Sequence, residues 1–265
     1  MDIICKIKAA KTAVLLSFIV MATVNILANA LPLNGIKTGE VSSYYKNLFT
    51  PASYTFAIWG LIYILLAAFV LYQFGLFGGS SSTASRNLIT KIVVPFVISS
   101  LANAFWVFFW HYDFIPLSML MMVIILLCLI SINKTIKKAH LTGRDKVFIK
   151  LPFSIYFAWI TVATIANAAV FLVYLNWDGF GIPESIWTML MLCLSALIGA
   201  ATAGVNRDIP YGAVFVWAYA GIFARHISPS GYAWIYPSIA VTAAACAAFI
   251  VCVLVYIAAP QKRIS

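Results

Sequence analysis

The stretch LANAFWVFFW, residues 101–110, has a single amide among nine apolar residues and lies inside a longer apolar run, 88–110. Its first four residues recur as LANA at 27–30 and nearly as IANA at 165–168. About 20 apolar residues suffice for a helix to cross the hydrocarbon core of a bilayer. An Asn at that depth is costly unless it is hydrogen-bonded, and flanking Ala residues let a neighbouring helix approach. The stretch therefore predicts a membrane-spanning helix that carries one bonded amide.

The composition of the whole chain agrees with that prediction. Of 265 residues, 64% are hydrophobic and 9% are charged, and the mean hydropathy is +1.01. Soluble domains carry about 25% charged residues. The net charge is +10, but the positive residues lie between apolar runs, a pattern that orients membrane helices. We therefore expect the chain to interact with a lipid bilayer and not with nucleic acid.

Eight apolar runs are long enough to span a membrane. They cover residues 12–31, 51–74, 88–110, 114–133, 151–175, 184–205, 210–226 and 233–258. The shortest of them is 210–226. These runs predict an all-α fold, a polytopic membrane helix bundle with about eight transmembrane helices.

The distribution of Lys and Arg predicts the orientation of these helices. With eight spans and the N-terminus inside, fourteen of the 17 basic residues fall in inside segments, and only Lys37, Lys46 and Arg225 fall outside. Cytoplasmic loops carry the excess of Lys and Arg. We expect a multi-pass integral protein of a prokaryotic cell membrane with cytoplasmic N- and C-termini.

The first run has an alternative interpretation as a secretory signal peptide. Ala28-Asn29-Ala30 has the small-x-small form of a cleavage site and follows a basic N-terminus. The apolar part from Thr12 to Ala28 has 17 residues, whereas a signal peptide's apolar region has about 7–15. We therefore expect the first helix to be retained.

The three repeated tetrapeptides place Asn29, Asn103 and Asn167 in the outer halves of three co-oriented helices. Two interpretations stay open: hydrogen bonds that join helices, each contributing about 1 kcal/mol, or a ring of amides that lines a cavity. The helix of Asn29 contains no Trp, so we expect Asn29 only to pack.

Seven candidate ligand-binding residues share helical faces in three of the runs. Trp59 and Tyr63 are four residues apart, Asn103 and Trp106 three apart, and Trp159, Ala163 and Asn167 form a stripe at four-residue spacing. Each pattern alone is common in helix cores. The specific feature is the order of all three along the chain.

That order resembles the TspO/MBR family, the tryptophan-rich sensory and translocator proteins. The Trp-x-x-x-Tyr of FAIWGLIY, the Asn-x-x-Trp of NAFW and the Trp-x-x-x-Ala-x-x-x-Asn of WITVATIAN match family motifs in the family's order. The resemblance covers about residues 10–176 and implies a five-helix bundle at 1–176. A C-terminal extension of three more transmembrane helices would occupy 177–265.

The resemblance implies a receptor or sensor that binds a tetrapyrrole, porphyrin or haem, or another planar apolar molecule. Trp59 and Trp159 would form pocket walls, Ala163 would keep the pocket open, and Asn103 and Asn167 would make polar contacts. A small-molecule transporter and a porphyrin-degrading enzyme are the alternatives. We expect binding rather than catalysis, with no required cofactor; a homodimer remains open.

The chain departs from the resemblance at two places. The loop before the second helix reads KNLFTPASY (46–54), with one Pro and no Trp, whereas the family has a Trp and paired prolines there. The three last helices have no counterpart in a five-helix family. We expect close-packing stripes on two of them: Ser195, Gly199 and Ala203, and Ala240, Ala244 and Ala248.

The sequence indicates no catalytic residues and no metal ligands. It contains no Ser/His/Asp set, no phosphate loop and no two-His zinc motif. The five cysteines form no Cys-x-x-Cys pair, and we expect them to act as small packing residues. His111 and Asp113 are expected to form a solvated turn after the third helix.

Overall fold

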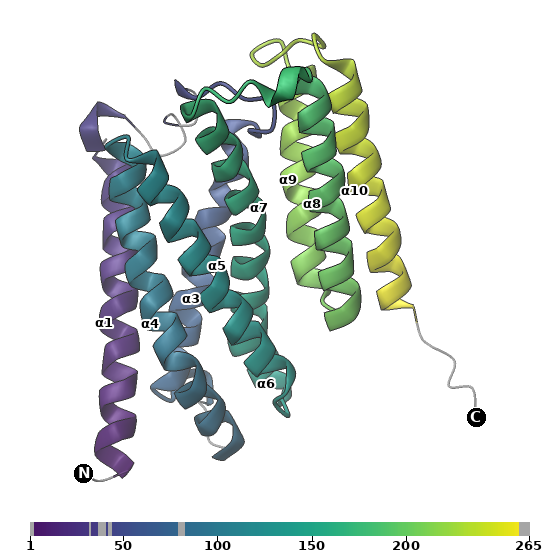
Figure 1. Cartoon of the computed structure of the whole chain (residues 1–265). Coiled ribbons are helices and arrows are strands. Elements are labelled where there is room, and N and C mark those ends of the chain that lie inside the picture. Colours follow the sequence, from purple (N-terminus) through teal and green to yellow (C-terminus); the bar gives the residue numbers. More distant parts are fainter. Residues whose placement is uncertain (1–2, 32, 37–40, 42–43, 79–82, 260–265) are drawn as a thin grey trace. The chain divides into compact units, whose positions relative to one another are not determined.

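The computed structural model describes residues 3–31, 33–36, 41, 44–78 and 83–259, with the side chains of 3–7, 29, 78 and 83–86 left out. Eight long helices form at the eight predicted places, and the described residues contain no strand (Figure 1). They are α1 (Ile3–Ala30), α3 (Ile58–Gln73), α4 (Thr83–His111), α5 (Ile115–Lys137), α7 (Leu151–Tyr174), α8 (Glu184–Asn206), α9 (Ile209–Ile227) and α10 (Pro237–Ala258).

Short helical segments occupy several connections between the long helices. These are η1 (Leu33–Gly35), η2 (Ser53–Ala57), η3 (Leu76–Gly78), α6 (Gly143–Asp145), the π-helical η4 (Lys146–Lys150) and η5 (Gly179–Gly181). A capping box between Thr142 and Asp145 begins α6.

Proline and turn residues determine where several helices begin and end. A Pro stands in the first turn of α5, α7, α9 and α10, where its missing N–H has no intrahelical partner to lose. Arg207 ends α8 in a left-handed conformation, with φ 47°. The carboxylate of Asp208 then accepts a hydrogen bond from the backbone N–H of Tyr211 and caps α9.

The helices belong to two compact units. The first unit comprises Met1–Lys46 and Ala57–Leu175, and the second comprises Asn47–Phe56 and Asn176–Ser265. The second unit begins next to the predicted division between 176 and 177. It also includes the loop 47–56, which the sequence did not indicate.

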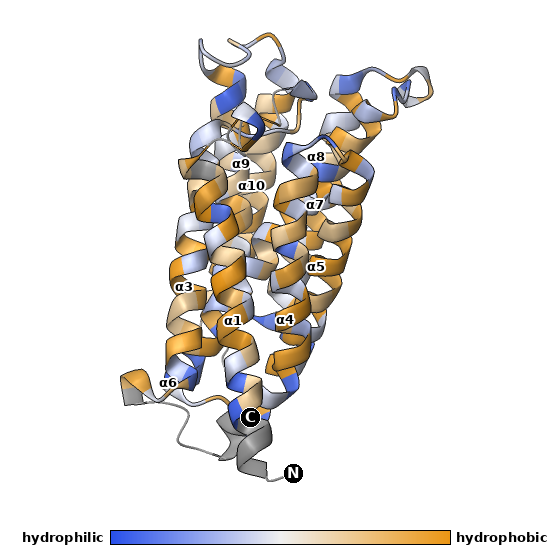
Figure 2. Cartoon of the chain, turned by 90° about the vertical axis from the view of Figure 1, so that its left-hand side faces the viewer, coloured by the Kyte–Doolittle hydropathy of each residue, from blue (hydrophilic) through white to orange (hydrophobic). Residues whose placement is uncertain are grey.

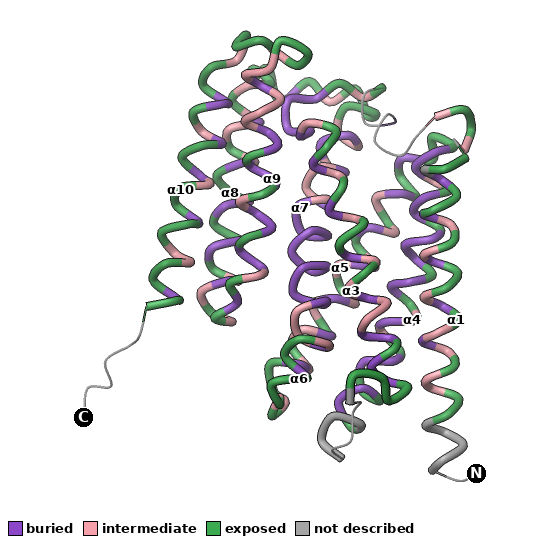
Figure 3. Tube along the Cα trace, turned by 180° about the vertical axis from the view of Figure 1, so that it is seen from behind, coloured by how far each residue is buried: buried purple, intermediate pink, exposed green. Residues whose placement is uncertain are grey.

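The first unit is a closed ring of five helices. Going around the ring, α1 packs on α4, α4 on α5, α5 on α7, α7 on α3, and α3 on α1. Within it, α7 is buried without interruption from Pro152 to Val162 (Figure 3). Large side chains from three of these helices therefore meet in the interior of the ring.

The second unit packs α10 against α8 and α9. The predicted stripe on α8 is confirmed, because Ser195, Gly199 and Ala203 are all buried. The predicted stripe on α10 is wrong: Ala240 is buried, but Ala244 and Ala248 are exposed. The buried face of α10 instead follows Ile239, Ala240, Ala243, Cys246, Ile250 and Ile257. Several helix faces are apolar, and four-residue spacing alone did not identify the packed one.

The outward faces of the helices are strongly apolar. Exposed side chains such as Ile64, Val94 and Leu127 are 68%, 64% and 59% accessible, and Figure 2 shows hydrophobic residues along the helix surfaces. Seven helices of the described chain are long and apolar enough to cross a membrane. The remaining long helix is α9, with 19 residues, which is the run that was expected to be shortest.

The loop 47–56 is held by the second unit. The backbone carbonyls of Asn47 and Thr55 accept hydrogen bonds from Tyr232 Oη and Trp217 Nε1, and Nε2 of His226 lies 2.9 Å from the carbonyl of Leu48. The N–H of Ala52 donates to the carbonyl of Gly221. The N–H of Leu48 donates to the carboxylate of Glu184, so the loop that departs from the family pattern has its partners on α8, on α9 and in the turn after α9.

The turn after α4 was expected to be solvated, but one of its two polar residues is buried and both contact other segments. His111 is buried, and its Nδ1 lies 3.2 Å from the carbonyl of Leu33. Asp113 is exposed and accepts a 2.6 Å hydrogen bond from Tyr45 Oη. Partial burial and the Asp113 carboxylate raise the pKa of Tyr45 to about 12, so Tyr45 stays a proton donor at neutral pH.

Candidate functional site

Trp59 lies at the centre of an aromatic cluster inside the first unit. Its ring centroid is 5.7 Å from that of Tyr63, 6.0 Å from Trp106, 6.2 Å from Trp159 and 6.3 Å from Tyr156. These five residues, called the aromatic cluster below, come from α3, α4 and α7. Four of the five were predicted as site residues. Their separations are those of interacting aromatic pairs.

The helical spacing explains how each pair reaches the cluster. Trp59 and Tyr63 are one turn apart on α3, and their rings stack with an angle of 14° between their planes. Trp159 meets Trp59 edge to face, at 86°. Tyr156 lies one turn before Trp159 and was missed as a site residue. Its spacing from Trp159 would have identified it, because residues three apart share a helix face.

Asn103 connects the aromatic cluster to α1. Its side-chain carbonyl accepts a 2.7 Å hydrogen bond from the amide of Asn25, and its own Nδ2 lies 3.4 Å from Tyr156 Oη. Both Asn side chains are buried. Asn25 was missed by the sequence reasoning, although an amide within an apolar run was a detectable signal. The side chain of Asn29 lies outside the described residues.

Asn167 lies apart from the cluster. It is eight residues beyond Trp159 on α7, about 12 Å along the helix, and its Oδ1 is 3.4 Å from the hydroxyl of Ser118 on α5. Ala163 is half-buried between the two. In the described part of the chain, Asn103 and Asn167 therefore each join a different pair of helices and do not form one ring of amides.

The cluster is mostly buried, and its remaining exposed surface belongs to two of its residues. Trp106 and Trp159 are 6% and 2% exposed, whereas Trp59 and Tyr63 are half-buried. Two carbon surfaces in contact lie about 3.5 Å apart, so a flat molecule between two rings needs about 7 Å between their planes. The observed packing leaves no such gap between Trp59 and Trp159. A flat ligand must stack against the exposed parts of Trp59 and Tyr63 or move the rings apart.

Two polar groups of the cluster are buried without a matching acceptor. Trp106 Nε1 and Tyr63 Oη form no hydrogen bond of normal geometry with any residue that the structure describes. Buried donors are rarely left unpaired, and an unpaired one costs about 1–3 kcal/mol. The cluster therefore offers flat apolar surfaces and two donors with free hydrogen-bonding capacity.

The chemistry available at the cluster is recognition. Its side chains are indoles and phenols, and the adjoining Asn103 adds an amide; none of these groups ionises near neutral pH. Such a set can stack against an aromatic molecule and donate to its acceptor atoms. It provides no acid–base pair for general catalysis.

Comparison with known proteins identifies a family. A family model described as TSPO-like protein matches residues 11–256. The match extends beyond the expected range of about 10–176 and includes all or most of each of the eight long helices. No curated protein and no solved structure matches the chain.

Proposed function

The chain belongs to the TSPO-like protein family, and on that premise we propose that it is a membrane receptor for a planar, mostly apolar ligand of the tetrapyrrole class, bound at the aromatic cluster. Family membership and the apolar helices make it a multi-pass membrane protein of the receptor or sensor type. The ligand class and the site are the proposal.

One observation carries the proposal: Trp59 is surrounded by four aromatic rings, of which Tyr63 stacks on it, and Trp59 is still only half-buried. A porphyrin is flat and apolar, and it carries a few acceptor atoms on its ring and substituents. Stacking on Trp59 and Tyr63 suits its plane, and the unpaired donors of Trp106 and Tyr63 suit its acceptors. No charged group needs to be buried for this recognition.

The test is a titration of the detergent-solubilised full chain with protoporphyrin IX, followed by the porphyrin absorption band. We expect saturable binding with one ligand per chain. In a Trp59→Phe, Trp159→Phe double variant we expect affinity to fall about tenfold, because each indole contributes about 0.5–1.5 kcal/mol beyond its area.

The second unit supplies a matched control. Trp177 and Trp187 also touch each other, with centroids 5.0 Å apart. A Trp177→Phe, Trp187→Phe double variant makes the same chemical change outside the cluster and should bind within about twofold of the wild type. Equal affinity in the two double variants, or no saturable binding by the wild type, would refute the proposal.

Transport and ligand breakdown are separated from binding by two further measurements. A transporter would carry protoporphyrin IX into proteoliposomes, and a receptor would not. A degrading enzyme would remove the porphyrin absorption band under light. We favour binding, because the cluster supplies stacking surfaces and donors but no acid or base.

A further inference from the structure

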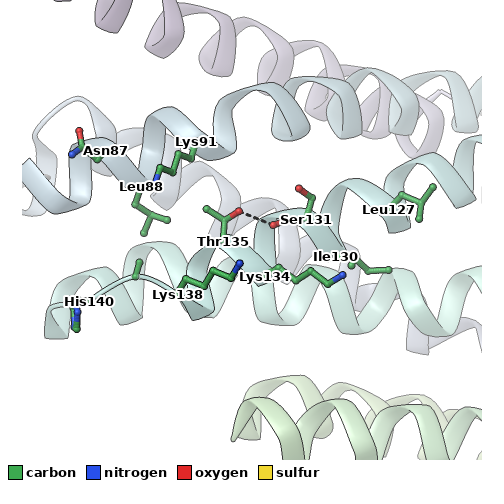
Figure 4. Close-up of a pocket in the computed structure, with 11 residues that line it drawn as sticks. Asn87, Leu88, Lys91, Leu127, Ile130, Ser131, Lys134, Thr135, Lys138 and His140 are labelled. Atoms are coloured by element: carbon green, nitrogen blue, oxygen red, sulfur yellow. Dashed lines mark hydrogen bonds between the residues drawn. The ribbon is translucent and has the colours of Figure 1, made fainter.

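A groove lies between α4 and α5, apart from the aromatic cluster. The groove encloses about 670 Å³, within the range of small-molecule sites. Its lining, shown in Figure 4, comes from the start of α4, the last half of α5 and the turn after α5: Asn87, Leu88, Lys91, Leu127, Ile130, Ser131, Lys134, Thr135, Lys138, Ala139 and His140. All of these residues belong to the first unit.

The lining is basic at one end. Lys91, Lys134 and Lys138 line the groove together with His140, and no carboxylate does. Three positive charges without a negative one among the lining residues make this end attractive to an anion. Thr135 donates its hydroxyl hydrogen bond to the backbone carbonyl of Ser131 on its own helix, so the lysines are the principal donors for a ligand (Figure 4).

The other end of the groove is apolar. Along α5 and the residue after it, the lining begins at Leu127 and Ile130 and ends at Lys138, so it changes from apolar to basic over eleven residues, about 16 Å. Leu127 is 59% exposed. The apolar end lies deeper along the membrane-spanning part of α5, which covers Ile115–Lys137, and the basic end lies where that span finishes.

We propose that this groove binds an anionic phospholipid, with the phosphate on Lys91, Lys134 and Lys138 and an acyl chain along Leu127 and Ile130. The negative phosphate of such a lipid matches the lysines in charge. The lipid also matches the groove in depth, because lipid phosphates lie at the membrane surface and acyl chains lie below them. A free phosphate would use the basic end but leave the apolar half unfilled.

The test is native mass spectrometry of the solubilised full chain with equal amounts of dioleoyl phosphatidylglycerol and dioleoyl phosphatidylcholine. We expect the wild type to retain the anionic lipid at least about tenfold better. A Lys91→Gln, Lys134→Gln, Lys138→Gln variant should retain the two lipids about equally. A Lys137→Gln, Lys146→Gln, Lys150→Gln variant loses the same charge outside the groove lining and should keep the preference within about twofold.

A blocking variant separates groove binding from general surface charge. Ser131→Phe keeps every lysine but fills the middle of the groove, and it should also reduce the preference for phosphatidylglycerol. No preference in the wild type, or an equal loss in the two lysine variants, would overturn the proposal. Displacement of phosphatidylglycerol by millimolar inorganic phosphate, with Ser131→Phe behaving as wild type, would replace the lipid with a simple anion.

Discussion

The rings of Trp59 and Trp159 meet edge to face, with their centroids 6.2 Å apart, although the two residues lie 100 positions apart in the chain. This contact joins α3 to α7 in the interior of the five-helix ring. It places the two tryptophans that the family resemblance implies as pocket walls against each other.

The hydrogen bond between Asn25 and Asn103 should stabilise the packing of α1 on α4. Replacing either residue by Ala is expected to lower the free energy of unfolding by about 1 kcal/mol, since interhelical bonds in membranes contribute about 0.6–2 kcal/mol. Unfolding of the single and double variants in mixed micelles gives the coupling energy. The control pair, Asn25→Ala with Thr242→Ala, should be additive, because Thr242 bonds only to the backbone of its own helix. Additivity in the Asn25–Asn103 pair itself would disprove the link.

Gly199 on α8 should tolerate no side chain. A Cβ there would lie 2.7 Å from the ring of Phe215 on α9, whereas a Cβ at Gly204, on the same helix, meets nothing within 4 Å. Gly199→Ala is expected to destabilise the protein by about 1–3 kcal/mol. Gly204→Ala should be neutral or stabilising by up to about 1 kcal/mol, because Ala favours helix. Thermal unfolding of both variants measures the difference, and equal behaviour would contradict the packing of α8 on α9.

The orientation of the chain depends on whether α9 crosses the membrane. At 19 residues, about 28 Å long, it nearly matches the hydrocarbon core. With eight spans both termini lie on the same side of the membrane, and the distribution of Lys and Arg predicts that this side is the cytoplasm. A fluorescent-protein fusion at the C-terminus of bacterially expressed protein should therefore fluoresce, and an alkaline phosphatase fusion there should be inactive. The reverse pattern would mean that α9 does not span.

The first helix should be present in the mature protein. Its removal after Ala30 would delete Asn25 and leave the buried amide of Asn103 without its 2.7 Å partner. Intact mass spectrometry of the membrane-extracted protein should therefore find a chain that includes residues 1–30, apart from loss of the initiator Met. A mature chain that begins at Leu31 would show that this helix is a signal peptide.

Local sequence patterns predicted the helices well and their partners less well. Apolar runs gave the eight helices because spanning length and hydropathy are properties of each segment alone. The pairs Trp59–Tyr63 and Asn103–Trp106 were found because helical spacing fixes a shared face. Anchoring of Leu48 by His226 joins residues 178 positions apart, which no local pattern contains.

The sequence also did not show which face of a helix packs against neighbouring helices. On α10, Ala244 and Ala248 looked equivalent to Ala240, but the neighbouring helices cover Ala240 and Ala243. In a helix with apolar residues on several sides, hydrophobicity does not distinguish a lipid-facing side from a protein-facing one. The amide of Asn25 would have indicated the packed face of its helix better than hydrophobicity does, because a buried amide needs a hydrogen-bond partner.

The most direct test of the central claim is a structure of the full chain with protoporphyrin IX bound. We expect the macrocycle to lie against the ring of Trp59, with the donors of Tyr63 and Trp106 directed to its acceptor atoms. If the macrocycle enters between Trp59 and Trp159, it should separate the two rings to about 7 Å or more between their facing surfaces. A macrocycle bound elsewhere, with the aromatic cluster unchanged from its present packing, would contradict the account.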